Sequence, residues 1–523
     1  MKNHIVIPPL DLFIIVAYIV AILATGILST RKVKVTGQVF FLAGRSLPWG
    51  IVGAALFASN ISTIHLVGLT ASGYNEGLVW GNFEWMAAFT LVLLSLVFAP
   101  FYFRSRLSTL PEFLERRYSP ASRSLLAVMA ITAALFIHIG MSIYAGAAVF
   151  EQFFGISVTT SIAVVVTETV NTVFLLLGAV IITLYAMHAL PAHGIHSIAE
   201  FRAATRPNQL SMLQRHSAAG LNWYAVFLGY PVLGVWYWCT DQTIVQRVLG
   251  ARSERDAQLG PLLAGFLKIL PVFLLVLPGV IAYVLFHDII GSNSNQTLPV
   301  LINELVPTGL KGLISAAVLA ALFSAVSAAL NSSGTLVAVD IVKRIRPETS
   351  DRGLVQIGRI SSTVVMILAV LWSTQGGRFS SIFEAINVIA ADLAPPITAV
   401  FVMGVFWRRG TKEASIITMI TGFIIGAISF VLDLPVFGSE KLITQGLGIS
   451  FMMQAWWVFC LCTLLFVVVS LLTPPPAPEQ IEGLTWEHPF SVIFGKKLEG
   501  LSDPRVVAGL LMATMVVLYC IFR

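Results

Sequence analysis

The sequence predicts an all-α polytopic membrane protein, and three observations carry that prediction. Hydrophobic residues make up 57% of the 523 residues and charged residues only 11%, whereas a soluble domain is about 45–50% apolar and about 25% charged. The mean hydropathy is +0.86. The 40 Gly and 24 Pro fit helices in lipid, where both residues are tolerated. This composition excludes a water-soluble enzyme, a soluble receptor and a disordered or fibrous chain.

Apolar runs long enough to cross a bilayer recur along the whole chain, since one span needs about 20 mostly apolar residues. The candidate spans are 10–29, 48–71, 78–103, 123–153, 157–190, 219–246, 258–287, 310–342, 355–373, 381–407, 414–432, 451–472 and 504–522. The first run is span-length and is not followed by a small-residue cleavage site, so we do not expect it to be a cleaved signal peptide.

Clusters of Lys and Arg set the expected orientation, because cytoplasmic loops carry the excess of these residues. Clusters follow the first and third spans, and others lie at Arg247, Lys343, Arg408 and Lys496. With all of them in the cytoplasm, both termini are outside. The segment 157–190 must then cross an even number of times, although two full spans need about 40 residues. We therefore expect a shortened or distorted hairpin there, or one long helix.

Two spans carry residues that interrupt helices in their middles. The second has a polar run within 57–63, and the sixth has Gly and Pro residues within 229–234. Unwound backbone at membrane depth is tolerated where it lines a cavity, and broken helices in both halves of a chain indicate a transporter binding site. Taken singly, each is explained by a kink or by small-residue packing. As a pair they favour a transporter.

Ionisable side chains inside spans are costly and are usually functional. Glu84 and Lys268 lie in mid-span, and we expect each to find a partner, with the other as the first candidate. Further candidates are His65, His138, Glu168, Asp241 and Asp392. The four Cys lie in apolar stretches and give no disulfide framework or zinc site. The hydroxyl-rich span 312–337 offers the oxygen atoms that Na+ prefers.

Specific strings in the sequence, all in the same order, carry a family resemblance. They are FLAGRSLPW (41–49), ASNIS (58–62), FEW (83–85), TLPEF (109–113), WYWCTDQ (236–242), IVQR (244–247) and PP (395–396). The chain resembles the sodium/glucose cotransporters of the solute:sodium symporter family from about residue 10 to residue 410.

The resemblance implies a leucine-transporter-like fold with two inverted five-helix repeats, one helix before them and three after. We expect a single transporter domain over 1–523, with repeats at 48–190 and 219–407 and peripheral helices at 414–523. Family members have an additional stretch between Ile162 and Ala163, so the region of the fourth and fifth core helices is shortened here.

The implied function is secondary active transport rather than catalysis. The resemblance implies Na+-coupled symport, by alternating access, of a glucose- or galactose-like sugar or a related polyol in the plasma (cell inner) membrane. The expected partners are the sugar, Na+ and the lipid bilayer, with no nucleic acid.

The family's site residues carry over by motif. The substrate site would use Asn60, His65, Glu84, Tyr237, Trp238, Lys268 and Asn387. The outer gate would be Leu69, Phe83 and Phe383, and the inner gate Tyr237. Sodium would bind backbone oxygens of Ala58, Ile61 and Ala321 and the Ser324 hydroxyl. Charged, amide and imidazole groups suit sugar hydroxyls, which both donate and accept, and an aromatic face covers the apolar face of the ring.

Departures from the family pattern leave alternatives open. Ala325 stands where a second serine is usual, Asn387 replaces a glutamine, and Thr167-Glu168 replaces a Thr-Asp motif. A coupling-defective relative, acting as a sugar sensor or uniporter, is therefore a second hypothesis. A membrane enzyme with Glu84 and His65 as an acid/base pair is a third, but the sequence has no nucleophile motif or metal-ligand cluster to support it.

Overall fold

The computed structural model describes residues 8–30, 46–105, 107, 110–140, 171–374, 381–434, 441–486, 498 and 500–523. Within these ranges the regular secondary structure is helical, apart from the single-residue bridges Leu47–Ala251 and Gln214–Asn222, and turns and loops connect the helices. Nine helical segments of the described ranges are long and apolar enough to cross a membrane, or ten if one sharply bent pair forms a single span.

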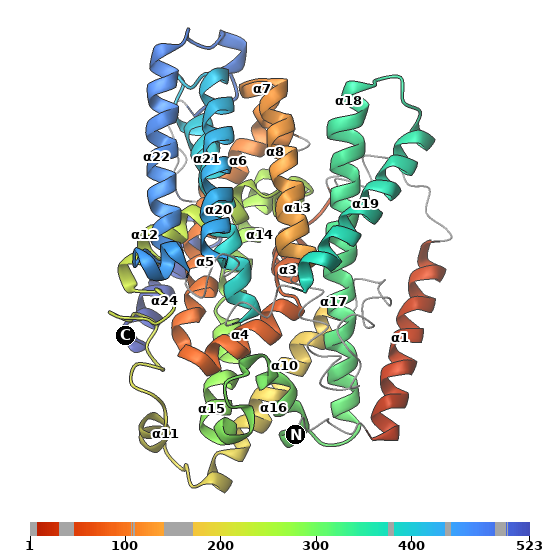
Figure 1. Cartoon of the computed structure of the whole chain (residues 1–523), viewed down its shortest axis with the longest axis vertical. Helices are drawn as coiled ribbons and strands as arrows, with labels where there is room; N and C mark the ends of the chain where they lie inside the picture. Colours follow the sequence, from red (N-terminus) through yellow and green to blue (C-terminus); the bar gives the residue numbers. More distant parts are fainter. Residues whose placement is uncertain are drawn as a thin grey trace.

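The helices form one elongated bundle (Figure 1). The α-helices are α1 (Pro9–Thr30), α3 (Trp49–Asn60), α4 (Thr63–Glu76), α5 (Asn82–Leu93), α6 (Ala99–Arg104), α7 (Leu110–Arg117), α8 (Pro120–Ala133), α10 (Asn171–Ala189), α11 (Ile198–Ala204), α12 (Trp223–Gly234), α13 (Gln242–Leu249), α14 (Glu254–Leu267), α15 (Leu277–Ile290), α16 (Thr297–Leu305), α17 (Leu310–Thr335), α18 (Lys343–Ile345), α19 (Asp351–Ser373), α20 (Ile382–Phe406), α21 (Lys412–Asp433), α22 (Phe451–Leu472) and α24 (Pro504–Ile521). Short π-helical turns join several of them, including η7 (Val235–Thr240) and η10 (Leu336–Val342).

Hydroxyl side chains fix where many of these helices begin. A serine or threonine precedes the first helical residue and its oxygen accepts a backbone N–H of the first turn, which satisfies an otherwise unpaired donor. These caps are Ser119, Ser197, Ser253, Ser350, Ser381, Thr411 and Ser450.

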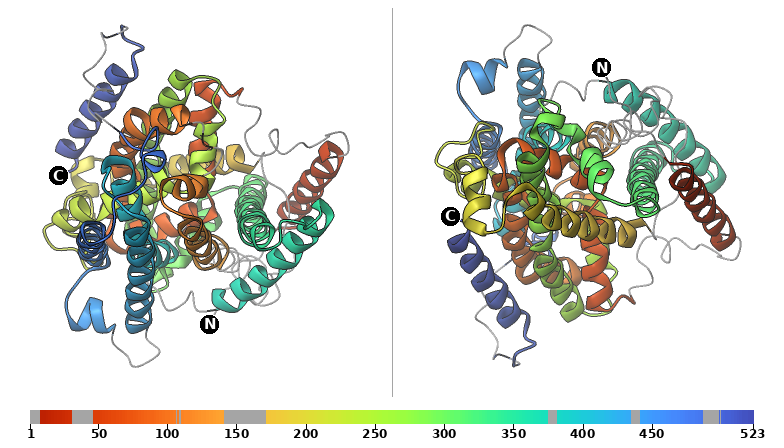
Figure 2. Two further views of the ribbon diagram at one scale, coloured as in Figure 1. Left: turned by 90° about the horizontal axis from the view of Figure 1, so that it is seen from above. Right: turned by 90° about the horizontal axis from the view of Figure 1, so that it is seen from below.

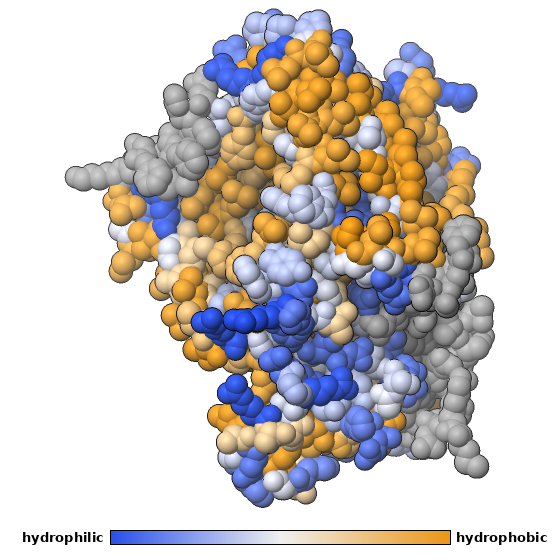
Figure 3. Space-filling model, turned by 60° about the vertical axis from the view of Figure 1, so that its left-hand side comes forward, coloured by the Kyte–Doolittle hydropathy of each residue, from blue (hydrophilic) through white to orange (hydrophobic). Residues whose placement is uncertain are grey.

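The outer helices present apolar faces. On α22 the exposed side chains Trp457, Leu461, Leu464, Val468 and Leu471 recur every three or four residues and so form one stripe. In Figure 3, where the side carrying α22 comes forward, hydrophobic side chains cover much of the upper half and hydrophilic ones gather below. A broad apolar surface of this kind faces lipid, and the chain is a multi-pass membrane protein.

The predicted break in the second span is confirmed. α3 ends at Asn60 and α4 begins at Thr63, and the two axes differ by 61°. Ile61 and Ser62 between them have extended backbone, with ψ of 119° and 178°. The polar run therefore interrupts the helix at the depth of the bundle centre.

The predicted break at 229–234 is wrong in its position. α12 continues through Pro231 to Gly234, a π-helical turn follows, and the helix is interrupted only at Asp241, whose ψ is 127°. The glycines serve packing instead: a Cβ on Gly229 would lie 2.3 Å from the Met452 carbonyl oxygen, and one on Gly234 would lie 2.7 Å from Thr90 Cγ2. Here glycine allows close approach to neighbouring helices rather than unwinding.

Close helix contacts set the position of the bundle centre. α3 packs against α14 at Gly53, where a Cβ would lie 2.7 Å from the Gly260 carbonyl oxygen. α20 is buried along most of its length between α12, α21 and α22. α1 packs against α17 at one edge, and α24 lies on the opposite side of the bundle (Figure 2).

Of the segment 157–190, the part 157–170 lies outside the described residues. The remainder forms α10, which packs against α15, α16 and α17. The expected shortening at Ile162–Ala163 therefore stays a prediction.

Candidate functional site

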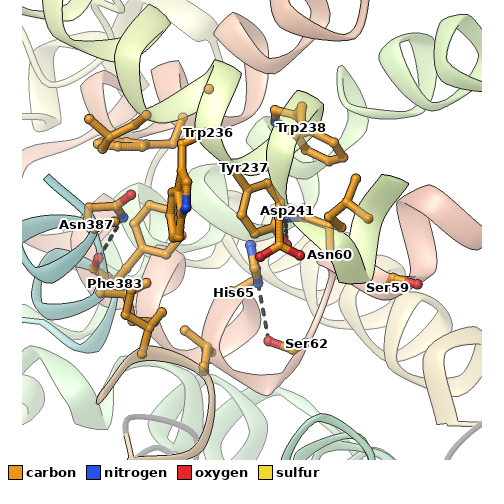
Figure 4. A pocket seen from close by; sticks show the side chains of 18 of the residues that line it. Ser59, Asn60, Ser62, His65, Trp236, Tyr237, Trp238, Asp241, Phe383 and Asn387 are labelled. Carbon is orange, nitrogen blue, oxygen red and sulfur yellow. Dashed lines mark hydrogen bonds between the residues drawn. The ribbon is translucent and has the colours of Figure 1, made fainter. Parts of the chain in front are cut away.

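A cavity of about 210 Å³ lies where the two interrupted spans meet. Side chains from α3, α4, α5, the α12–α13 region, α14 and α20 face it (Figure 4). All seven predicted substrate residues line this cavity: Asn60, His65, Glu84, Tyr237, Trp238, Lys268 and Asn387. The structure thus brings together residues that are more than 300 positions apart in the sequence.

A buried ion pair forms the polar centre of the cavity. Lys268 Nζ donates to Glu84 Oε2 at 2.5 Å, and both side chains are almost fully buried, at 1% and 2% exposure. The expected pairing of these two residues is confirmed. Lys268 Nζ also donates to Asn60 Oδ1. Since an isolated charge in this environment is strongly unfavourable, the three side chains stabilise one another.

The local backbone explains why a lysine is tolerated here. α14 ends at Leu267, Lys268 is its C-terminal capping residue, and Pro271 follows shortly after. A cation at a helix C-terminus is stabilised by the helix dipole. Lys268 Nζ also lies 5.3 Å from the centroid of the Trp238 ring, a cation–π distance.

The break between α3 and α4 lets residues from both helices face the same space. Asn60 Nδ2 donates to the Tyr237 hydroxyl at 3.0 Å. His65 Nδ1 lies 3.3 Å from Ser62 Oγ, and its Nε2 lies 3.9 Å from Glu84 Oε1. The hydrogen bond from Asn60 joins the broken helix to the π-helical turn η7, and the longer His65–Glu84 contact brings it close to α5.

Aromatic rings close one side of the cavity. Phe83 and Phe383 meet edge to face with centroids 5.5 Å apart, and both line the cavity. Asn387 Nδ2 donates to the Phe383 carbonyl oxygen at 2.8 Å, within α20. Leu69, the third predicted gate residue, is fully buried and is not among the residues that line the cavity.

Sequence reasoning missed two aromatic residues of the cavity. Trp236 lies between Asn387 and Tyr237 in Figure 4. Tyr230 also lines the cavity, and its hydroxyl donates to the Phe83 carbonyl oxygen at 3.1 Å. The Trp-Tyr-Trp run was a visible signal, but the π-helical turn that brings all three rings to the cavity depends on packing. Asp241, where the helix is interrupted, lines the cavity as well.

The predicted sodium ligands are only partly within the described side chains. Ala58 and Ile61 lie at the C-terminal end of α3, where the last carbonyl oxygens of a helix have no helical partner. Ala321 and Ser324 belong to α17, but their side chains lie outside the described part. Among the described residues, no group of three or more His, Cys, Asp or Glu is arranged to hold a metal ion.

Other buried ionisable candidates do not belong to this site. Asp392 on α20 is buried and accepts a hydrogen bond from Gln454 Nε2 of α22 at 2.5 Å, and it does not line the cavity. Glu168 and the side chain of His138 lie outside the described residues.

Comparisons with known proteins agree with this architecture. A profile of the sodium:solute symporter family matches residues 40–422. The sodium/mannose cotransporter of Bos taurus is 34% identical over 91% of this chain and 89% of its own length. The sodium/myo-inositol cotransporter 2 of Oryctolagus cuniculus is 31% identical over 91% of this chain and 79% of its own. The sodium/glucose cotransporter 1 of Ovis aries is 30% identical over 91% and 80%.

A solved structure shares the fold. It is the substrate-bound, outward-open state of a Na+-coupled sialic acid symporter, which superimposes with a TM-score of 0.71 over 90% of this chain and 99% of its own, at 19% identity. The likeness supports the leucine-transporter-like helical arrangement expected from the sequence.

Proposed function

Because this chain belongs to the sodium:solute symporter family, we propose that it carries a neutral sugar or polyol, together with Na+, through the cavity around Glu84 and Lys268. Members of this family are transporters, not enzymes, so the acid/base hypothesis for Glu84 and His65 is set aside. The proposed mechanism is alternating access, in which the cavity opens to each side of the membrane in turn.

The choice of a neutral substrate rests on one observation: the two buried charges at the centre of the cavity, on Lys268 and Glu84, neutralise each other. Lys268 is bonded to Glu84 and Asn60. Among the lining residues that the structure describes, this leaves no lysine or arginine dedicated to an anionic solute, and Asp241 adds a carboxylate. Donors and acceptors on Asn60, His65, Tyr237 and Asn387 match hydroxyl groups, and aromatic rings suit the apolar face of a sugar.

The relatives support the same class. Their names specify mannose, myo-inositol and glucose as co-transported solutes, and all three are neutral and polyhydroxylated. The cavity volume of about 210 Å³ is compatible with a small solute. We propose Asn60, His65, Glu84, Tyr237, Trp238, Lys268 and Asn387 as the substrate-binding residues, with Phe83 and Phe383 as an outer gate and Tyr237 as the inner one.

We propose the sodium site between the end of α3 and α17. It would use carbonyl oxygens of Ala58, Ile61 and Ala321 and the Ser324 hydroxyl. In this proposal the two inverted repeats are residues 48–190 and 219–407, and the helices of residues 414–523 lie at the periphery. Each repeat would contribute one side of the sodium site, so that Na+ binding favours one relative arrangement of the two.

The experiment that tests the proposal is uptake by the purified chain in liposomes, with Na+ or choline outside. Labelled glucose, mannose and myo-inositol form the neutral panel, and glucuronate and glucosamine are charged controls of the same size. We expect Na+-stimulated uptake of at least one neutral solute and none of glucuronate. Uptake of glucuronate in preference to glucose would contradict the assignment of the cavity.

A coupling-defective sensor or uniporter is the second candidate, favoured by Ala325 at the position of a usual sodium-site serine. Equal uptake in Na+ and choline would establish a uniporter. Binding of a neutral sugar without any uptake would establish a sensor.

We propose the plasma (cell inner) membrane as the location, with both termini outside. The positive clusters support this orientation. This orientation places Glu348 in the cytoplasm and Ala192 outside the cell. The variants Glu348→Cys and Ala192→Cys therefore test it, in a background where the exposed Cys520 is replaced by Ser. An impermeant thiol reagent added to intact cells should label Ala192→Cys only. Labelling of Glu348→Cys instead would reverse the orientation.

A further inference from the structure

We propose that a groove beside α14 binds an anionic phospholipid. The groove has a volume of about 940 Å³ and opens at the surface, apart from the substrate cavity. Its lining includes Trp49 of α3, Arg252 just before α14, Arg255 in its first turn, and Leu259, Leu263 and Phe266 further along α14. We call it the α14 groove.

The α14 groove changes from charged to apolar along its length. Arg252 and Arg255 are exposed and lie at the end of the spanning segment, which begins at Glu254. Leu259, Leu263 and Phe266 follow at intervals of three or four residues and therefore share one face of α14. A phospholipid has the same order of chemistry, a charged head followed by an acyl chain.

The guanidinium groups are held in place but remain accessible. Arg252 Nε donates to Asp256 Oδ2 at 2.9 Å, and the arginine side chain is still 59% exposed. Arg255 Nη2 donates to Ser502 Oγ at 2.6 Å. Because guanidinium carries five N–H donors in a planar fork, each arginine can bond its protein partner and a phosphate together.

Asp256 is the one carboxylate among the described residues that line the α14 groove, and it faces internal partners. Asp256 is buried and accepts hydrogen bonds from Ser253 Oγ, from Arg252 and from the Trp49 backbone N–H at 2.8 Å. It therefore fixes the groove's walls, while the arginines dominate the charge that a ligand meets. This charge complementarity favours an anionic head group.

Trp49 marks the depth of the groove in the bilayer. Trp49 is 45% exposed, whereas Trp80 and Trp85 in the bundle interior are buried. Exposed tryptophans concentrate at the boundary between head groups and hydrocarbon. The positive-inside rule places this end of α14 in the cytoplasm, and basic pockets between spans on that side bind anionic lipid head groups.

Lipid binding is tested on the full-length chain in detergent by native mass spectrometry. Phosphatidylglycerol and phosphatidylcholine with the same acyl chains are titrated separately. We expect phosphatidylglycerol to bind at least fivefold more tightly. Equal affinity for both lipids would overturn the proposal.

Variants locate the site. Arg252→Gln/Arg255→Gln should weaken phosphatidylglycerol binding roughly 20-fold, and Arg252→Gln alone about fivefold, whereas the exposed Arg346→Gln should leave it unchanged. If the double variant does not fold, the single variant decides. Leu259→Trp fills the apolar half and should reduce binding of both lipids while the arginines remain. Unchanged phosphatidylglycerol binding in Arg252→Gln would refute the site.

Soluble competitors separate a lipid from a free phosphate. Inorganic phosphate and glycerophosphoglycerol present the head-group chemistry without acyl chains. Neither should displace phosphatidylglycerol at matched concentration, since the apolar half contributes to binding. Displacement by either would show a soluble-anion site and overturn the lipid assignment.

Discussion

The carboxylate of Asp11 accepts the backbone N–H of Gly312 at 2.7 Å, across 301 residues of sequence. It also accepts the N–H of Gly309 at the same distance. These donors belong to the beginning of α17, so a side chain from α1 caps a helix that is distant in sequence. Asp11 is fully buried, and a negative charge is favourable at a helix N-terminus.

Removing this cap should destabilise the protein. Asp11→Ala leaves the buried N–H of Gly312 and the partly buried N–H of Gly309 without an acceptor, and we expect a loss of about 2 kcal/mol. Asp11→Asn, which keeps an acceptor oxygen, should lose less. Thermal unfolding in detergent measures both, with the exposed Asp288→Ala as control. An unchanged unfolding temperature for Asp11→Ala would show that the hydrogen bonds from Gly309 and Gly312 to Asp11 do not stabilise the packing of α1 against α17.

The Glu84–Lys268 pair should be essential for solute binding and sensitive to single substitutions. Glu84→Gln or Lys268→Met leaves the partner's charge buried and unpaired, which costs about 3–5 kcal/mol. The double variant removes both charges, so it should recover stability without recovering sugar affinity. Unfolding and sugar-binding measurements separate these effects.

The exposed pair Arg104–Glu254 supplies the control. Glu254→Gln should change stability by less than about 1 kcal/mol. Normal sugar affinity in Glu84→Gln would remove Glu84 from the substrate site.

A methyl group at Gly279 should disrupt the contact between α4 and α15. A Cβ there would lie 2.0 Å from the Thr70 carbonyl oxygen, which is backbone and cannot rotate away. We expect Gly279→Ala to cost at least about 1–3 kcal/mol. Gly509→Ala is the matched helical control, because its Cβ meets nothing within 4 Å. It should be neutral or slightly stabilising, and similar behaviour of the two variants would contradict the packing.

Sodium dependence should respond to the two adjacent positions on α17. Ser324→Ala removes a proposed ligand and should abolish the stimulation of uptake by Na+. Ala325→Ser adds the hydroxyl that this sequence lacks and should lower the half-saturating Na+ concentration. Uptake measured over a range of Na+, with choline as the replacement, tests both. An Ala325→Ser variant with wild-type Na+ dependence would mean that another group, such as Ser327, completes the site.

Glu115 should make stability depend on pH in the acidic range. Burial opposes its ionisation, but hydrogen bonds from Arg123 at 2.6 Å and Arg344 at 2.5 Å outweigh burial and lower the pKa of its carboxyl below the usual 4.5. A lowered folded pKa gives stability that is present above pH about 4.5 and lost as the pH falls through the folded value.

The comparison is between the wild type and Glu115→Gln, unfolded at several pH values. The variant should be less stable near neutrality, and the difference should shrink as the pH falls. The exposed Glu348→Gln serves as control. A difference that does not vary with pH would indicate that Glu115 contributes through packing alone.

The sequence predicted which side chains lie together in the cavity more accurately than it predicted the backbone around them. Glu84 and Lys268 were recognisable because lone charges in apolar spans require partners, and the polar run near Asn60 marked a true interruption. Gly229 and Pro231 wrongly suggested a helix break. A glycine is compatible both with an unwound backbone and with close helix packing, and only the position of the neighbouring Met452 shows that packing is the reason here. Trp236 was missed because the π-helical turn that directs it is set by tertiary contacts rather than by local preference.

The hydrogen bonds around the cavity have one more consequence, for selectivity among stereoisomers. Lys268, Asn60 and Tyr237 already bond to one another, so an arriving solute replaces existing bonds instead of adding new ones. Each replacement yields little net free energy, but a hydroxyl pointing the wrong way leaves a protein group unpaired at a cost of about 1–3 kcal/mol. If these residues bind the sugar as proposed, an epimer that differs at one carbon should be rejected by roughly five- to 150-fold, even when the favoured sugar itself is held only weakly.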